Sequence, residues 1–160
     1  MLRIVERNAT IVRNIFLNLA IFLLPIPRLR RSVLRWFGNE VADDAQIGLS
    51  VFVDSRLRLA PGSRIRSFSC FSGVTLSLQK RASIGSLNIF KGYFDVLLGE
   101  GASIGNICQF KNGGPKLVAK RSRFSMGPTS NVTSGHYFDL SADIEIGHGT
   151  VIGGRGSSFW

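Results

Sequence analysis

Cysteine, histidine and long apolar runs are all scarce in this chain of 160 residues. The two cysteines, Cys70 and Cys108, are too few for a disulfide framework, and neither has a CxxC partner or a nearby pair of ligands. We therefore expect both to be reduced, small apolar residues of a core. The two histidines are one short of the three protein ligands that a catalytic zinc site commonly uses. The composition therefore predicts no metal site.

No stretch of the chain has the length of a membrane-spanning helix. The most apolar run, IFLNLAIFLLPIP at residues 15–27, is uncharged over about half of the ~20 residues that a spanning helix needs. Arg13 limits it on one side and Pro25 on the other. Because no small-residue cleavage site follows, we also expect no cleaved signal peptide.

Acidic residues are outnumbered two to one, and the imbalance is concentrated near the N-terminus. Lys and Arg number 20 against 10 Asp and Glu, which gives a formal net charge of +10. Residues 1–36 hold seven arginines and one acid, Glu6. This asymmetry predicts an anionic partner for the N-terminal segment. Because the arginines are not interleaved with stacking aromatics and no reader motif occurs, we expect no nucleic-acid binding.

Residues 1–39 are predicted to form a separate helical segment, with two interpretations. In the first, residues 11–37 make a peripheral contact with a membrane: leucines and phenylalanines enter the headgroup boundary, Trp36 and Phe37 lie at its level, and the arginines at 28, 30, 31 and 35 meet anionic lipid. In the second, the helix caps the open end of the domain that follows. Both interpretations can hold together.

From Glu40 onward apolar residues recur every six positions, with occasional slips. The series is Val41, Ile47, Val53, Leu59, Ile65, Phe71; Leu78, Ile84, Phe90, Val96; Leu98, Ile104, Phe110; Val118, Phe124; Val132, Phe138; and Ile146, Ile152. Glycine often follows the aliphatic residue, as in IGLSVF and IGHGTV, and a small or β-branched residue often stands four positions after it. Such self-similarity is typical of repeat architectures.

A period of six suits neither an amphipathic helix nor a simple hairpin. It predicts short straight segments with a corner every six residues, where the aliphatic side chain points into a narrow core and glycine permits the backbone angles of the corner. Three segments would close a coil of about eighteen residues, and stacked coils form a solenoid. We therefore predict an all-β solenoid domain over residues 40–160.

The repeat resembles that of the hexapeptide-repeat, left-handed parallel β-helix proteins, most of which are acyltransferases. Within that family, LRRSVLRWFG and VTSGHYFDLSADIEIGHGTVIGGRGSSFW resemble the bacterial polysaccharide O-acetyltransferases. The resemblance implies left-handed coils, acetyl-CoA as acyl donor without a metal, and a sugar or glycan acceptor, such as an O-antigen precursor. It also implies a homotrimer with the donor bound between subunits, and a cytoplasmic location, at the inner face of the cytoplasmic membrane.

His136 is the residue predicted to be catalytic. The apolar spacing widens to eight on both sides of it, from Phe124 to Val132 and from Phe138 to Ile146, and we expect the swollen coil to carry a site. A neutral imidazole can take the proton of a sugar hydroxyl as its oxygen attacks the thioester. The alternatives are a structural or a substrate-contacting histidine. His148, between two glycines in a regular repeat, is expected to be solvated.

The remaining predicted site residues follow from the resemblance. Gly153 and Gly154 would leave the backbone open to the pantetheine arm of the donor. Arg155 and the basic pair at 120 and 121 could meet its phosphates, with a solvated face as the alternative for all three. The expected acceptor contacts are Asn131, Ser134, Tyr137 and Asp139. Asp139 or Asp143 is a candidate for holding the second imidazole nitrogen, with a surface carboxylate as the alternative for each.

The sequence ends within a repeat, at GGRGSSFW. The resembled enzymes usually continue for several coils, and a further histidine often follows a tryptophan at this place. We therefore expect a solenoid that is cut short. The alternative function is a catalytically inactive repeat fragment, or a scaffold or assembly partner of a longer acyltransferase.

Overall fold

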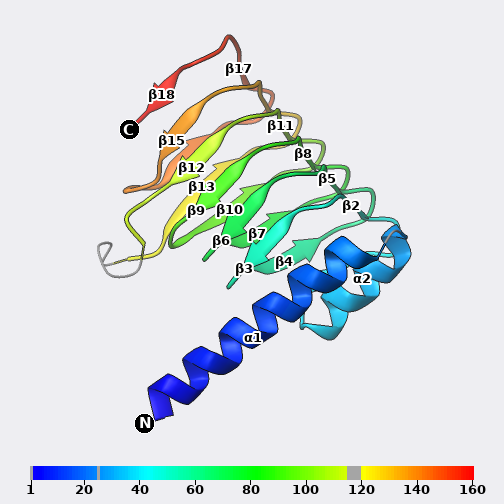
Figure 1. Cartoon of the computed structure of the whole chain (residues 1–160). Helices are drawn as coiled ribbons and strands as arrows, with labels where there is room; N and C mark the ends of the chain where they lie inside the picture. The colour runs from blue at the N-terminus through cyan, green and yellow to red at the C-terminus, as the bar shows by residue number, and fades with distance from the viewer. Residues whose placement is uncertain (1, 25, 115–119) are drawn as a thin grey trace.

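The computed structural model describes residues 2–24, 26–114 and 120–160, with side chains from residue 10 onward. Two helices, α1 (Leu2–Leu23) and α2 (Pro27–Trp36), precede a three-sided parallel β-solenoid of six coils (Figure 1). Each side of the solenoid is a six-stranded parallel sheet, and successive strands of the chain fall on successive sides. The predicted class of fold, an all-β solenoid with an N-terminal helical segment, is confirmed.

We name the three sides sheets A, B and C. Sheet A contains β1 (Glu40–Val41), β4 (Arg56–Leu59), β7 (Thr75–Leu78), β10 (Phe94–Leu98), β13 (Ser122–Met126) and β16 (Ile144–Ile146). Sheet B contains β2 (Gln46–Ile47), β5 (Arg64–Ile65), β8 (Ser83–Ile84), β11 (Ser103–Ile104), β14 (Asn131–Val132) and β17 (Val151–Ile152). Sheet C contains β3 (Val51–Val53), β6 (Cys70–Ser72), β9 (Ile89–Lys91), β12 (Gln109–Lys111), β15 (Tyr137–Asp139) and β18 (Ser158–Phe159).

The strand register turns the six-residue repeat into columns of stacked side chains. Ile47 pairs with Ile65, and the column continues through the sheet B strands to Ile152. In sheet C the inward residue of the first coil is Phe52, which pairs with Phe71, so Val53 was wrongly placed in the repeat. In sheet A, Leu98 pairs with Met126, 28 residues on, whereas the predicted partner at 118 lies outside the described residues.

Phenylalanine fills the inner face of sheet C from the first coil to the last. Ring centroids of successive coils lie 4.5 to 5.2 Å apart along this column, with interplanar angles of 1° to 13°. The stack consists of Phe52, Phe71, Phe90, Phe110, Phe138 and Phe159. Stacked rings at this separation gain energy beyond their buried area, so the column is a main determinant of coil spacing.

The glycine that follows the aliphatic residue has a different role from the predicted one. A Cβ on Gly85 would lie 2.4 Å from the carbonyl oxygen of Gly105 in the next coil, and neither residue has a positive φ. Glycine is needed there because the coils approach closely. The left-handed backbone of the same corner falls two residues later, at Leu87 (φ 62°) and Ile107 (φ 60°).

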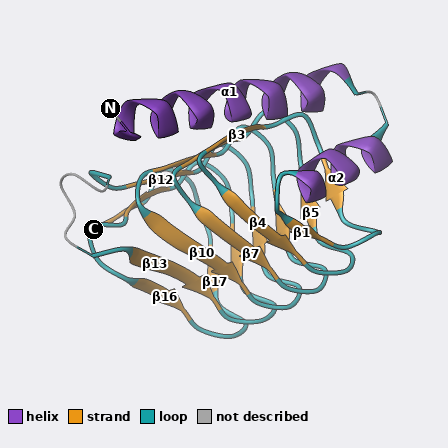
Figure 2. Cartoon of the chain, turned by 90° about the horizontal axis from the view of Figure 1, so that it is seen from below, coloured by secondary structure: helices purple, strands orange, loops and turns teal. Residues whose placement is uncertain are grey.

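The two helices cover the first coil, where the three sheets would otherwise end in open edges (Figure 2). Helix α1 lies on β3, and α2 lies on β1 and β2. Leu17, Ile21 and Leu34 are the buried apolar residues of this contact. An exposed edge would present unpaired backbone groups to other chains, so a cover of this kind protects the solenoid from edge-to-edge association.

Polar side chains of the two helices form hydrogen bonds with backbone groups at the edge of the first coil. The Asn18 side chain accepts a hydrogen bond from Phe52 N–H and donates one to Phe52 O, both at 2.8 Å. Arg30, Arg31 and Arg35 donate to the carbonyl oxygens of residues 47, 45 and 41. These three arginines, which we expected to meet lipid, therefore hold the first coil.

Replacing Asn18 with alanine is expected to lower the free energy of unfolding by about 1–3 kcal/mol, because two backbone groups of Phe52 lose their partners in a part-buried contact. Urea unfolding followed by circular dichroism measures the change. Arg13→Ala, on the exposed side of the same helix, is the matched control and should change stability by less than about 0.5 kcal/mol. Equal effects of the two substitutions would contradict the capping role of Asn18.

Candidate functional site

His136 lies inside the solenoid, at the corner between sheets B and C. Its side chain is 1% exposed and points inward beside Phe138 and Phe159, whose ring centroids are 6.5 and 6.2 Å from that of the imidazole. The eight-residue apolar spacing next to His136 does not come from the swollen coil that was predicted from the sequence. Strand β13 has two inward apolar residues, Phe124 and Met126, and the regular six-residue interval to β14 resumes from the second. The lengthened connection of the solenoid lies between β12 and β13.

A column of buried polar residues runs up this corner, and His136 stands at its upper end. The same place in the coils below, one residue before each sheet C strand, is occupied by Ser50, Ser69, Asn88 and Cys108, each 0% to 2% exposed. The side-chain oxygen of Asn88 accepts from Cys108 N–H at 2.8 Å, while its amide donates to Gly105 O at 2.8 Å. The column thus supplies partners for corner backbone groups that the sheets leave unpaired.

The imidazole of His136 has one hydrogen-bonding partner in the described residues. Its Nε2 lies 3.0 Å from the hydroxyl oxygen of Thr133, and that hydroxyl lies 2.9 Å from the carbonyl oxygen of Gly154, to which it donates. Nδ1 is buried without a partner among the described residues. A buried unpaired nitrogen costs about 1–3 kcal/mol, so this position is not a fully satisfied structural one.

Neither candidate carboxylate holds Nδ1. Asp139 accepts hydrogen bonds from the backbone N–H and the hydroxyl of Ser141, and Asp143 accepts one from Arg123 N–H. Both carboxylates accept local hydrogen bonds, Asp143 from an exposed position and Asp139 from a half-buried one. His148 is exposed, as expected, with its Nε2 3.5 Å from the Thr129 hydroxyl.

The other predicted site residues fall into two groups. Asn131 and Ser134 lie at the outer side of sheet B and its corner, and the Thr133 hydroxyl joins this region to Gly154 in the last coil. A Cβ on Gly153 or Gly154 would meet no atom within 4 Å, so the backbone there is open.

The second group is on a different side of the molecule. Tyr137 and Asp139 flank the inward Phe138 in β15, so their side chains belong to the outer face of sheet C. The Tyr137 ring contacts that of Trp160, with centroids 5.5 Å apart. Arg155 is exposed in the last coil. The structure therefore places Asn131 and Ser134 beside Thr133 on the sheet B side, and Tyr137 and Asp139 on the outer face of sheet C.

A polar groove follows the outer side of sheet B. It has a volume of about 390 Å³ and is lined by backbone and small polar side chains of four successive coils, among them Ser83, Ser103, Asn131, Thr133 and Ser134. The His136 ring is not part of its lining, but the Thr133 hydroxyl is. The groove thus contacts the buried imidazole through one hydroxyl.

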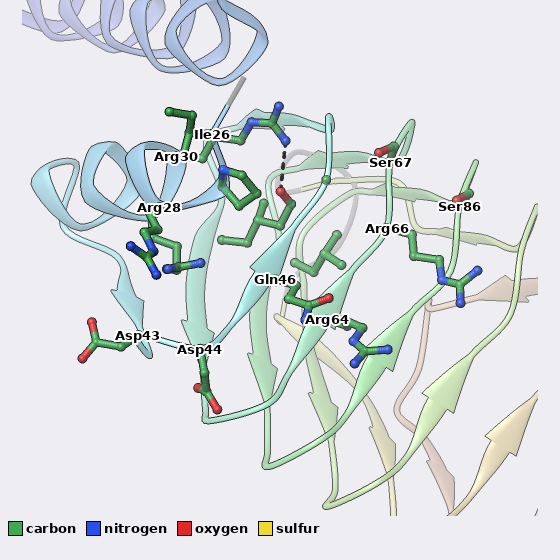
Figure 3. Close-up of a pocket in the computed structure, with 15 residues that line it drawn as sticks. Ile26, Arg28, Arg30, Asp43, Asp44, Gln46, Arg64, Arg66, Ser67 and Ser86 are labelled. Carbon is green, nitrogen blue, oxygen red and sulfur yellow. Dashed lines mark hydrogen bonds between the residues drawn. The ribbon is translucent and has the colours of Figure 1, made fainter. Parts of the chain in front are cut away.

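The groove shares Arg64 and Arg66 with a larger cleft of about 880 Å³ between α2 and sheet B. Figure 3 shows Arg64 and Arg66 projecting side by side from sheet B, with Arg28 near the start of α2. Five arginines and two aspartates line this cleft. The sequence pattern did not predict this cleft. Helix α2 lies outside the repeat, and only the folded structure shows that it lies beside sheet B.

Arg121 is not available for cofactor phosphates. Its guanidinium pairs with Asp95, donates to the Thr75 hydroxyl at 2.8 Å, and lies 4.6 Å from the centre of the Tyr93 ring. These contacts fasten the residues before β13 to sheet A.

The two cysteines are both free, but only one belongs to the core. Cys108 is buried, whereas Cys70 is half-buried, next to the inward Phe71. Burial raises the pKa of both thiols, so at neutral pH they are less often thiolate than an exposed cysteine.

No cluster of three or more potential metal ligands occurs in the part of the chain that the structure describes. Within the same residues, neither helix combines the length and the apolar character that crossing a bilayer requires.

The chain matches no protein-family model and no curated protein. Among solved structures, a match is the acetyltransferase domain of PglB from Neisseria gonorrhoeae, in complex with acetyl coenzyme A. The two chains are 18% identical, with a TM-score of 0.28, over 80% of this chain. The chain spans 63% of the length of that domain.

Proposed function

We propose that this chain is an acetyl-CoA-dependent O-acetyltransferase that acts on a hydroxyl of a sugar or of a surface-polysaccharide precursor. The observation that carries the proposal is the polar groove on sheet B of a hexapeptide-repeat solenoid. The groove contains Asn131 and Ser134, and it connects through Thr133 to the open backbone of Gly154. A pantetheine arm needs such an accessible strip of backbone, and an acceptor sugar needs hydroxyl and amide partners beside it.

In this proposal the base acts through Thr133. The Thr133 hydroxyl first turns its proton from Gly154 O to Nε2 of His136, which must be unprotonated. The acceptor hydroxyl oxygen then attacks the thioester carbonyl, the acceptor proton passes to the Thr133 oxygen, and the Thr133 proton passes to Nε2. The distance of 3.0 Å between the last two atoms is within the range for such a transfer. Collapse of the tetrahedral intermediate breaks the C–S bond, and the thiolate leaves as CoA after it takes back the proton held by His136, through Thr133. Backbone N–H groups of the open coil would stabilise the oxyanion.

Thr133→Val is therefore expected to lower kcat by about 100-fold or more, comparable with His136→Ala, while Thr133→Ser retains activity within about tenfold. The measurement is CoA release from acetyl-CoA in the presence of candidate sugar acceptors. Thr150→Val, at an exposed threonine of the last coil, is the control. Turnover that survives Thr133→Val at the wild-type rate would contradict the relay.

The second candidate function is a catalytically silent scaffold or assembly partner of a longer acyltransferase. It is favoured by the burial of His136 and by its place in a column of structural polar residues. Acetyl-CoA calorimetry on the folded chain separates the two candidates, since a scaffold should bind no donor.

We also propose that the active form is a homotrimer in which the acyl donor lies between subunits. Phe68, Leu87 and Ile107 form an exposed apolar ridge at the corner beside the groove, with exposed fractions of 64%, 54% and 57%. Their left-handed backbone is unfavourable for such side chains, and apolar ridges of this kind are typical of association surfaces. Light scattering measures the molecular mass in solution, which should be that of three copies of the chain.

The cytoplasmic membrane face is the proposed location. The outer side of α1 is apolar along its described length, with Ile15, Phe16, Leu19, Phe22 and Leu23 between 49% and 69% exposed. Arg13, which is exposed on the same helix, complements anionic lipid headgroups.

A further inference from the structure

The geometry points to a second ligand site: we propose that the arginine-lined cleft between α2 and sheet B binds a diphosphate group. The site adjoins the groove of the proposed acyl transfer, with which it shares Arg64 and Arg66, but it includes neither Thr133 nor His136. The proposal does not depend on the acetyltransferase activity. The residues that would hold the ligand are Arg28 on α2 and Arg64 and Arg66 on sheet B, with the hydroxyls of Ser67 and Ser86.

Three of the five arginines in the cleft have no partner. Arg30 and Arg31 are committed to carbonyl oxygens of the first coil. The guanidinium groups of Arg28, Arg64 and Arg66, which are all exposed, make no hydrogen bond or ion pair in the described residues. Gathering unpaired cations in one cleft is unfavourable because their charges repel, and an anion would remove this cost.

The aspartates of the cleft do not neutralise these arginines. Asp43 pairs with Arg35, which lies outside the cleft, at 2.7 Å. The hydrogen bond from Arg35, and then its charge, lower the pKa of Asp43 below its ordinary value. Asp44 is left as the single unpaired acid among the described residues that line the cleft.

The start of α2 adds to the positive potential. Its N-cap, Ile26, offers no side-chain hydrogen bond, and the first turn contains no acid but several arginines. Cations at the positive end of a helix are disfavoured, and an anion bound there is favoured. Because Ile26 and Arg28 line the cleft, this helix end faces the same space as Arg64 and Arg66.

The arrangement fits more than one phosphate. Arg64 and Arg66 are two residues apart on one outer face, which places their Cα atoms about 6.6 Å apart. Each guanidinium can bind phosphate oxygens in a bidentate manner, and Arg28 lines the side of the cleft that α2 forms. Serine hydroxyls at the lip donate further hydrogen bonds: the Ser67 oxygen already accepts from Leu49 N–H, so its proton is free for a ligand. A diphosphate engages both walls, whereas a single phosphate reaches one.

Isothermal calorimetry of the full chain with inorganic pyrophosphate tests the site. We expect saturable binding at sub-millimolar concentration. In the double variant Arg64→Gln/Arg66→Gln we expect it to weaken about 10- to 100-fold. The matched control is Arg56→Gln/Arg123→Gln, which removes the same charge from exposed, unpaired arginines on sheet A. Its binding should stay within about threefold of the wild type.

Three results would overturn the proposal: no binding of pyrophosphate by the folded chain at millimolar concentration, equal losses in the two double variants, or sulfate binding as tight as that of pyrophosphate. Circular dichroism of both variants confirms that they are folded. Titrations with ADP and with farnesyl diphosphate micelles identify the source of the group. Tighter binding of ADP supports a soluble nucleoside diphosphate, and tighter binding of the prenyl compound supports a lipid-linked one.

Discussion

Phe90→Ala is expected to destabilise the solenoid by about 3–5 kcal/mol, the range measured for removal of a buried aromatic side chain. Phe90 is 0% exposed and lies between Phe71 and Phe110, with ring centroids 5.0 and 4.5 Å away. Because each coil contacts only its neighbours, the lost contacts cannot be replaced from elsewhere in the molecule. Urea unfolding monitored by circular dichroism measures the loss.

The position of a ring in the stack should decide the size of the effect. Phe159→Ala, in the last coil and only partly buried, should cost less than Phe90→Ala, because Phe159 has a stacked neighbour on one side. Leu97→Ala, at an exposed residue of sheet A, should change stability by less than about 0.5 kcal/mol. A Phe90→Ala protein as stable as the Leu97→Ala protein would show that coil spacing does not depend on the aromatic column.

The periodicity of the sequence was sufficient to predict the solenoid, but not which residue of each segment points inward. Ile47, Ile65 and Ile84 were placed correctly because their segments keep a strict interval. Val53 was misplaced because Phe52, next to it, fills the same column with a larger side chain. Strand lengths in sheet A vary from two to five residues, so counting alone cannot separate a longer strand from a swollen turn.

The candidate site was harder to predict because it depends on which coils become neighbours. The Thr133 hydroxyl contacts both His136 and Gly154, although Gly154 lies 21 residues further along the chain. No local sequence motif indicates this role of Thr133. The arginine-lined cleft combines α2 with sheet B, and its unpaired members are known only when the partners of Arg30 and Arg31 are known. The sequence shows that these arginines are charged, but not which of them are already hydrogen-bonded within the fold.

The exposed apolar side chains of α1 predict that the chain binds a membrane surface. Replacing Phe16 and Leu23, which are 63% and 69% exposed, with aspartate is expected to weaken binding to phosphatidylglycerol vesicles by about 10- to 100-fold, because two side chains can no longer enter the headgroup boundary. Fold stability should be preserved, since both side chains are mostly exposed and the buried residues of the helix, Leu17 and Ile21, are unchanged. Vesicle co-sedimentation measures the change.

The matched control is Leu97→Asp/Val151→Asp, which adds the same charge at exposed apolar residues of the solenoid and should bind vesicles as the wild type does. Binding should also fall when phosphatidylcholine replaces phosphatidylglycerol and when salt is raised, because the arginine contribution is screened within about 10 Å at 0.1 M salt. If the wild-type protein does not bind vesicles, and if substitutions in α1 change only its molecular mass in solution, this apolar side would instead contact a second copy of the chain. The membrane proposal would then be wrong, and the helix would serve assembly alone.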